Sequence, residues 1–445
     1  MKSGLNKPLK VAVVGGGWAG LAAAVELCTA GAQVTLFEAA RQLGGRARSV
    51  QAQGQMLDNG QHLLLGAYHE TLRLMAMVGA DAERLLKRTT LDLHYPGVGS
   101  AGFRLRLPRL PSPFNLAVGL IAAPGASLDE KLGAVRLTRA LQRCNYRLDE
   151  DCSVAELLDA HRQHGKLRRL LWEALCLAAL NTAPQHASAQ IFANVLRDSL
   201  GGSRADTDLL LPAADLDRVF ALPAADYIRA QHGEIRLSSR VEHIVRDGDG
   251  FAVGDEKFDR VILATAPQHA AKLLSAHPTT ATTAALLGSY AYEPIGTLYA
   301  QYPAELRLPL PMLGLTGDSA GSHGQWVIDR GQLGGAPGLV AFVLSASGAW
   351  DEMDSAQLLA ALQRELEQAL ARSLPQPLWH QLISERRATF SCRPGLPRPA
   401  AASALPGLWL AGDYVCADYP ATLEGAVRSG VAAASGALRD RPADQ

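Results

Sequence analysis

The sequence is poor in aromatic residues, in charge and in cysteine. Of its 445 residues, 48% are hydrophobic, but only 6% are aromatic and 19% are charged. The hydrophobic surplus is therefore aliphatic, and it is too large for a disordered chain. Its six cysteines show neither a metal-binding spacing nor a disulfide framework, so we expect a reducing compartment and no metal site.

Neither sign of charge is in excess. Forty-three lysines and arginines balance 43 aspartates and glutamates, which argues against binding to nucleic acid, because that needs a surplus of basic residues. No uninterrupted run reaches the roughly 18 apolar residues that a membrane-spanning helix needs. We therefore predict a cytoplasmic protein, long enough for two or three domains with a large core.

A glycine motif near the N-terminus lies between an apolar stretch at 10–14 and an apolar helical pattern. The motif consists of Gly15, Gly17, Trp18, Ala19 and Gly20. The first glycine permits a tight turn, the second lets the backbone approach a pyrophosphate, and the third lets the helix pack on the strand. A second apolar stretch at 33–37 ends at Glu38, which is placed to accept hydrogen bonds from a ribose. This order predicts a Rossmann-like dinucleotide-binding unit.

The next segment, RQLGGRAR at 41–48, indicates which dinucleotide is bound. Gly45 allows another close backbone approach, and Arg46 can neutralise a phosphate or support the edge of a flavin. The segment resembles the R-x-x-GGR sequence of the flavin amine oxidase and carotenoid desaturase superfamily, where it also follows the ribose-binding acid. The resemblance implies FAD.

Later segments resemble the same superfamily. The resemblance implies a backbone contact from Val241 to adenine, and it places Gly412 and Asp413, after an apolar stretch at 408–411, beside the ribityl and pyrophosphate region. A helix from 422 to about 438, with Glu424 in its first turn, would meet the flavin edge that becomes anionic on reduction.

The cofactor segments are separated along the chain. We expect an α/β protein with a Rossmann-like FAD-binding domain of the amine oxidase type, built from 1–90, 215–290 and 395–445. Residues 91–214 and 291–394 would form an inserted, mixed α+β substrate domain. The apolar stretch LLWEALCLAAL at 170–180 predicts either a core helix or the lining of a hydrocarbon tunnel.

The region 114–147 combines apolar and basic residues. An apolar stretch at 114–123 precedes Arg136, Arg139, Arg143 and Arg147, whose spacing of 3, 4 and 4 predicts one face of a helix. A solvated helix face is one interpretation. The other is attachment to a membrane surface, at the inner face of the cytoplasmic membrane.

Three stretches are more selective: 58–71 (DNGQHLLLGAYHET), 174–196 and 412–430 (GDYVCADYPATLEGAVRSG). They resemble the squalene-associated FAD-dependent desaturase group, the hydroxysqualene dehydroxylases. The resemblance implies an isoprenoid lipid substrate, removal of the hydroxyl of hydroxysqualene with reduced FAD, and an external electron donor. A carotenoid desaturase is the nearest alternative. A flavin amine oxidase and a non-catalytic FAD-binding protein are more distant ones.

Dehydroxylation needs an acid that protonates the leaving hydroxyl. Four polar residues occur in segments that the resemblance places near the flavin: His62, Asp418, Tyr419 and Glu424. The sequence does not rank them, and a structural role is an equal alternative for His62.

Overall fold

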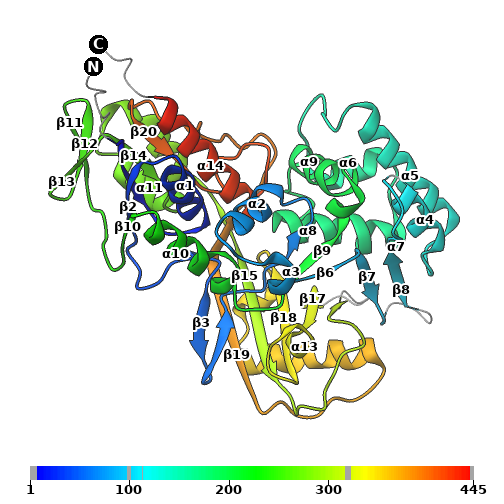
Figure 1. Cartoon of the computed structure of the whole chain (residues 1–445). Helices are drawn as coiled ribbons and strands as arrows, with labels where there is room; N and C mark the ends of the chain where they lie inside the picture. Colours follow the sequence, from blue (N-terminus) through cyan, green and yellow to red (C-terminus); the bar gives the residue numbers. More distant parts are fainter. Residues whose placement is uncertain (1–7, 98–101, 113, 316–321, 441–445) are drawn as a thin grey trace.

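The computed structural model describes residues 8–97, 102–112, 114–315 and 322–440. At its centre is a five-stranded parallel sheet with the strand order β10–β2–β1–β14–β20 (Figure 1). Its strands come from distant parts of the chain: β1 Lys10–Val14, β2 Gln33–Phe37, β10 Glu234–Arg236, β14 Arg260–Leu263 and β20 Leu408–Leu410. The expected α/β fold with a Rossmann-like sheet is thereby confirmed.

Both faces of this sheet are covered, as a parallel sheet requires. Val11 and Val13 pack with the helical side, which consists of α1 (Trp18–Thr29), α10 (Leu222–Ala230) and α14 (Leu423–Arg439). Ala12 and Val14 point to the opposite side. That side is covered by the antiparallel sheet of β11 Ile244–Asp247, β12 Gly250–Val253 and β13 Glu256–Phe258, and α11 Pro267–Leu274 and α12 Ala281–Gly288 follow in the chain.

A second, antiparallel sheet lies beside the first unit, with the order β16–β17–β18–β15–β19 (Figure 1). Its strands are β15 Tyr292–Gln301, β16 Met312–Gly314, β17 Trp326–Asp329, β18 Leu339–Ser345 and β19 Trp379–Phe390. The two longest strands pair from Tyr292↔Phe390 to Gln301↔Trp379. Helix α13 (Ser355–Leu370) packs on this sheet.

A helical unit occupies the far end of the molecule from the two termini (Figure 1). Its helices are α4 Phe114–Ala122, α5 Leu128–Arg143, α6 Val154–Ala160, α7 Gly165–Leu167, α8 Ala174–Leu180 and α9 Ala189–Leu200. The stretch at 170–180 is helical, with a π-helical first part (η1 Arg168–Glu173) that continues into α8. The expected helical row of arginines is wrong in one respect, because α5 ends at Arg143 and Arg147 lies beyond it.

Short elements connect these units. They are β3 Ser49–Ala52, β4 Gln55–Asp58, β5 Leu64–Leu65, α2 His69–Met77, α3 Ala82–Leu85, β6 Leu86–Thr89, β7 Asp92–Tyr95, β8 Phe103–Arg106 and β9 Leu209–Pro212. Five further single turns are η2 Arg204–Thr207, η3 Asp217–Ala221, η4 Pro278–Thr280, η5 Arg330–Leu333 and η6 Ala349–Glu352. Strand β9 pairs with both β5 and β6, so it crosses the predicted boundaries, and the division into two discontinuous domains stays a prediction.

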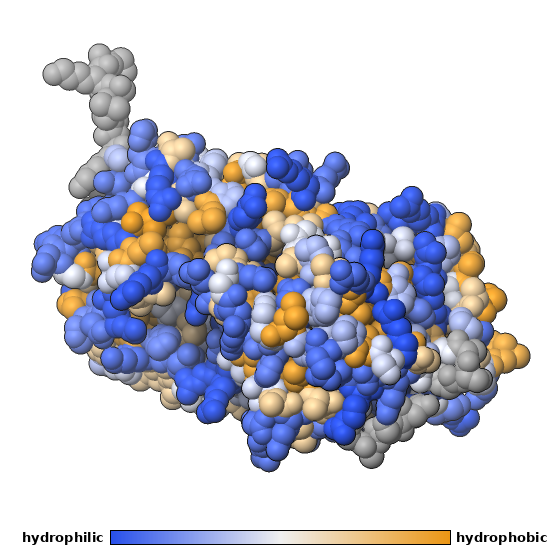
Figure 2. Space-filling view, turned by 90° about the horizontal axis from the view of Figure 1, so that it is seen from below, coloured by the Kyte–Doolittle hydropathy of each residue, from blue (hydrophilic) through white to orange (hydrophobic). Residues whose placement is uncertain are grey.

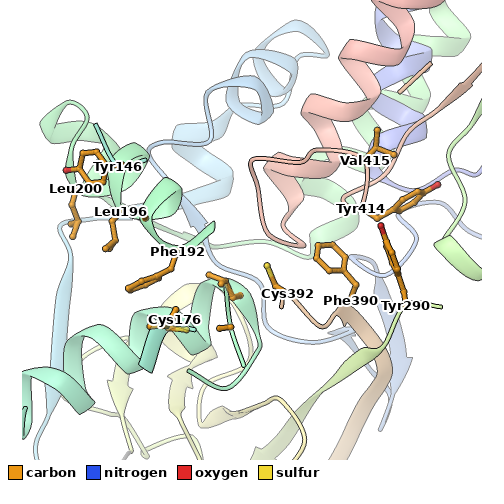
Figure 3. Close-up of a cluster of buried hydrophobic side chains, with 14 of the residues drawn as sticks. Tyr146, Cys176, Phe192, Leu196, Leu200, Tyr290, Phe390, Cys392, Tyr414 and Val415 are labelled. Carbon is orange, nitrogen blue, oxygen red and sulfur yellow. The ribbon is translucent and has the colours of Figure 1, made fainter. Parts of the chain in front are cut away.

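The hydrophobic core is continuous between the units. One buried cluster extends from Tyr146 and Leu200 in the helical unit, through Phe192, to Phe390 and Tyr414 beside the parallel sheet (Figure 3). Among the described residues, no helix is long and apolar enough to cross a membrane.

Candidate functional site

A cavity of about 940 Å³ connects the parallel sheet with the second sheet and the helical unit. Glycine and polar residues from the carboxyl ends of β1 and β2 line one part of it. Aliphatic residues from β7, α8, α9 and the second sheet line the other. Ligands of open parallel sheets bind at this edge of the strands.

The N-terminus of α1 faces the cavity without a cap. Gly17 is the N-cap residue, no side chain caps the helix, and its first turn contains no acid. The first amide groups of a helix lack partners within the helix and attract anions, so this end suits a pyrophosphate. A Cβ atom on Gly17 would meet only the Cα of Gly45, at 3.9 Å. The cradle above Gly17 is therefore open to a ligand.

The other two glycines of the motif serve the packing beneath this cradle. Gly15 has a φ of +112°, and a Cβ there would lie 2.6 Å from the carbonyl oxygen of Ala264. A Cβ on Gly20 would lie 1.9 Å from the carbonyl oxygen of Gly15. Gly15 borders the cavity, whereas Gly20 is not among its lining residues.

Glu38 lies at the carboxyl end of β2 and lines the cavity. Its carboxylate accepts hydrogen bonds from the backbone N–H groups of Gly16 and Ala40, both at 2.7 Å. These two bonds fix the carboxylate beside the glycine turn, and each of its oxygens keeps acceptor capacity for a ribose hydroxyl.

Arg46 and Asp413 form an ion pair in the cavity wall. The distance from Nη2 to Oδ2 is 2.7 Å, and Nη1 donates to the carbonyl oxygen of Ala388 at 2.6 Å. Burial alone would lower the pKa of Arg46, but the charge and the hydrogen bond of Asp413 raise it. Asp413 is buried, so the pair joins the GGR segment to the loop after β20.

The remaining residues expected to contact the cofactor also line the cavity. They are Trp18 and Ala19 of α1, Val241 in the turn before β11, and Gly412 after β20. Thr265 and Tyr414 line it as well, and within the described chain their hydroxyl oxygens are buried without a hydrogen-bond partner. Open glycine surface, free helix amides and unpartnered hydroxyls together fit a dinucleotide of the size of FAD.

His62 lines the cavity next to this polar part. Its Nδ1 lies 3.0 Å from the carbonyl oxygen of Gly60, so the Nδ1–H can donate there and Nε2 stays available to a ligand. Burial and the charge of Arg46 lower the pKa of His62 from its ordinary value of 6.5, against the opposing effect of the Gly60 carbonyl.

The structure does not bring the other three catalytic candidates to the cavity wall. Asp418 is exposed, and its carbonyl oxygen accepts a hydrogen bond from Asn194. The hydroxyl of Tyr419 donates to Asp198. Both side chains lie outside the cavity lining.

Glu424 points away from the cavity toward α2. Its carboxylate accepts hydrogen bonds from the backbone of Thr71 at 2.9 Å and from the Thr71 hydroxyl at 2.7 Å, and it pairs with Arg428 at 2.7 Å. Its neighbours Thr422, Leu423 and Ala426 line the cavity instead. Glu424 therefore joins two helices, and the cofactor contact expected of it stays a prediction.

Sequence reasoning missed polar residues that line the cavity from the second sheet and the helical unit. Asn181 ends α8 in the left-handed conformation, with a φ of +47°, and its side chain bonds to Pro294, Ala346 and Thr389. Glu385 lines the cavity from β19. No local motif marks these residues; the one available signal was an asparagine directly after the apolar stretch at 170–180, since asparagine often ends a helix.

The aliphatic part of the cavity resolves the two interpretations of 170–180. Leu170, Leu171 and Trp172 are buried in the core, whereas Leu175 and Ala178 line the cavity. The segment is therefore a core helix on one side and a cavity wall on the other.

Comparison with known proteins places this geometry in a wider group. The family model of the flavin containing amine oxidoreductases matches residues 18–438. The hydroxysqualene dehydroxylase of Rhodopseudomonas palustris is 30% identical, over 95% of this chain and 97% of that protein. The 15-cis-phytoene desaturase of Arabidopsis thaliana is 23% identical, over 95% of this chain and 79% of that one.

A solved structure shows the same fold at low identity. The cyclohexylamine oxidase of Brevibacterium oxydans superimposes with a TM-score of 0.66. It is 19% identical, over 98% of this chain and 99% of that one. At this identity the likeness bears on the fold alone.

Proposed function

Because this chain belongs to the flavin-containing amine oxidoreductase family, we propose for it one reaction of the FAD-dependent oxidoreductases: removal of the hydroxyl group of hydroxysqualene, which gives squalene. The observation that carries the proposal is the full-length relationship to hydroxysqualene dehydroxylase. The shape and lining of the cavity agree with a long aliphatic substrate.

Named residues would hold FAD along the polar part of the cavity. The amides after Gly17 would bind the pyrophosphate, Glu38 the ribose, and the backbone at Val241 the adenine. Arg46, fixed by Asp413, would lie at the flavin end. Reduced FAD, when bound, supplies the hydride that forms the new C–H bond.

The aliphatic part of the cavity would bind the isoprenoid chain. Leu93, Leu175, Leu196 and Met312 line it from four different elements. An allylic cation forms when the hydroxyl leaves, and water would capture it. These aliphatic side chains offer no groups that hold water, so they protect the cation on their side of the cavity until the hydride arrives.

We propose that His62 delivers the proton. The C–O bond breaks as the hydroxyl oxygen takes a proton from Nε2, and the oxygen leaves as water. The lowered pKa makes the imidazolium a stronger acid than an ordinary histidine, which suits a poor leaving group. Glu385 lines the same cavity and is the alternative proton donor, so it is tested together with His62.

The reaction consumes two electrons for each molecule of substrate. Among the described residues there is one glycine-motif nucleotide site, so we propose that an external donor reduces the flavin between turnovers. Because hydroxysqualene is a long isoprenoid alcohol of low solubility in water, we also propose that the enzyme takes it from the inner face of the cytoplasmic membrane.

A carotenoid-type desaturation is the second candidate, since phytoene desaturases match the chain at lower identity. The two reactions differ in the direction of electron flow. Desaturation needs oxidised flavin and leaves it reduced, whereas dehydroxylation needs reduced flavin and leaves it oxidised.

A single-turnover experiment separates the two. The purified holoenzyme is reduced without air, mixed with hydroxysqualene in detergent, and followed by flavin absorbance. Dehydroxylation predicts return of the oxidised spectrum with one squalene per flavin. A reduced enzyme that stays reduced with hydroxysqualene, while the oxidised enzyme is bleached by phytoene, would replace the proposal by desaturation.

A further inference from the structure

An exposed apolar patch lies at the tip of the helical unit. It is formed by α4 and the first turns of α5, which expose five large apolar side chains. They are Phe114 (64% exposed), Val118 (41%), Ile121 (73%), Leu128 (73%) and Leu132 (51%). Figure 2 shows apolar residues gathered along this end of the molecule. Single exposed apolar residues are ordinary, but a contiguous group on two neighbouring helices marks a binding surface.

The patch is a built feature of the two helices. The opposite side of α4 packs on β8, where a Cβ on Gly119 would lie 2.8 Å from Leu107. Lys131 of α5 donates to the carbonyl oxygen of Ile121 at the end of α4, at 2.8 Å. The helices are therefore fixed with their apolar sides turned outward together.

Basic residues continue the same side of α5. Counting 100° per residue, Leu128, Leu132, Arg139 and Arg143 fall within about 60° of the helix circumference. The exposed side is thus apolar near the tip and basic further along. Glu130, one of two acids in the first turn, is buried and accepts hydrogen bonds from Ser127 and Lys166. Asp129 is the exposed one, and it pairs with Arg136.

The aliphatic part of the cavity ends close to this patch. Ser199 and Leu200, at the end of α9, line the cavity. The hydroxyl of Ser112, two residues before α4 begins, donates to the carbonyl oxygen of Leu200 at 2.8 Å. Tyr146, just after α5, lies in the same cluster as Leu196 and Leu200 (Figure 3). The segment just before α4 therefore contacts the end of α9 that lines the cavity.

We propose that the patch formed by Phe114, Val118, Ile121, Leu128 and Leu132 inserts into a bilayer rich in anionic phospholipid, with Arg139 and Arg143 on the headgroups, and that the lipid substrate enters the cavity past Ser112 and Leu200. The entry route rests on the proposed function, whereas the docking surface does not. Apolar residues that dip below the headgroups beside a basic helix face fit a bilayer interface.

Vesicle binding tests the docking surface. The holoenzyme is sedimented with vesicles of phosphatidylcholine, alone or with phosphatidylglycerol. We expect wild-type binding to rise with the phosphatidylglycerol content. The triple variant Phe114→Ser/Ile121→Ser/Leu128→Ser should bind both kinds of vesicle about tenfold or more weakly. The double variant Arg139→Glu/Arg143→Glu should show a similar loss of binding on the anionic vesicles only. Leu378→Ser is the matched control, because Leu378 is 70% exposed before β19.

Turnover in two presentations tests the entry route. The triple serine variant should keep wild-type turnover of hydroxysqualene in detergent micelles and lose about tenfold when the substrate is in vesicles. Wild-type vesicle binding by the variant, or a dimer that the same substitutions convert to a monomer, would overturn the proposal. If the wild-type enzyme converted hydroxysqualene neither in micelles nor in vesicles, the proposed reaction would be refuted. The sedimentation result would still show whether the patch binds membranes.

Discussion

At the scale of single residues, the glycines of the first turn have separable tasks. Gly17 has ordinary backbone dihedrals and an open cradle, so a side chain there would occupy only the space of the pyrophosphate. We expect the Gly17→Val variant to bind FAD at least about tenfold more weakly, while its apoprotein loses no more than about 1 kcal/mol of unfolding free energy from the less favourable N-cap residue. Flavin content and thermal unfolding of the apoprotein measure the two effects.

Two further glycine substitutions control this result. Gly288→Ala should change neither quantity, because no atom lies within 4 Å of its Cβ. The Gly20→Ala variant should have a lower free energy of unfolding, because the added Cβ would collide with the carbonyl oxygen of Gly15. If the Gly17→Val variant kept its full FAD content, the assignment of the pyrophosphate site to Gly17 would be wrong.

His62 gives a prediction about pH. The protonated imidazole is the acid in the proposed step, and burial lowers its pKa below 6.5. The single-turnover rate should therefore be highest at low pH and fall as the pH rises through this lowered pKa. His62→Gln should lower the rate by about 100- to 10,000-fold and abolish this part of the pH dependence.

The exposed His186 provides the control. His186→Gln should keep both the rate and the pH profile. If His62→Gln retained the wild-type profile while Glu385→Gln lost it, the proton donor would be Glu385.

At the scale of secondary structure elements, Glu424 holds α14 against α2. Replacing it by alanine would leave the buried amide and hydroxyl of Thr71 without their acceptor, whereas the half-buried Arg428 would keep Asp198 as a partner. We expect Glu424→Ala to lose about 2–3 kcal/mol of unfolding free energy, measured by denaturant unfolding. Glu305→Ala, at an exposed position, should lose almost none. Unchanged stability combined with lost turnover would instead support the catalytic role expected from the sequence.

Several elements could be predicted because their signals are local. The strands β1 and β2, helix α1 and the glycine turn follow from a run of buried apolar residues and from three glycines at fixed spacing. The same local signals located Glu38 at the cavity, whereas the family resemblance located Arg46 and Asp413 there.

Other features depend on contacts that a local pattern does not contain. Glu424 belongs to the correct segment, but the rotation of α14 turns it toward α2 rather than toward the cavity. The arginine spacing continues to Arg147, yet Asn145 and Tyr146 adopt left-handed backbone conformations and end the helical row. The role of Asn181 arises from three segments that meet only in the folded chain.

At the scale of the whole molecule, the cavity explains the composition of the chain. Aliphatic residues from β7, α8, α9 and the second sheet line one part of it. The surplus of aliphatic over aromatic residues therefore suits a binding site for a flexible isoprenoid chain. The zero net charge conceals a local arrangement, in which the exposed side of α5 collects arginines beside an apolar patch. The polar part of the cavity suits FAD, and the aliphatic part suits the lipid substrate.

The most direct measurement is isotope transfer in a single anaerobic turnover. The holoenzyme is reduced without air in D2O, so that the exchangeable hydrogen on the reduced flavin is deuterium. It is then mixed with hydroxysqualene, and the lipid product is analysed by mass spectrometry. We predict squalene that carries one deuterium, formed in step with flavin oxidation. Recovery of unchanged hydroxysqualene, or of a product with additional double bonds and no deuterium, would contradict the account.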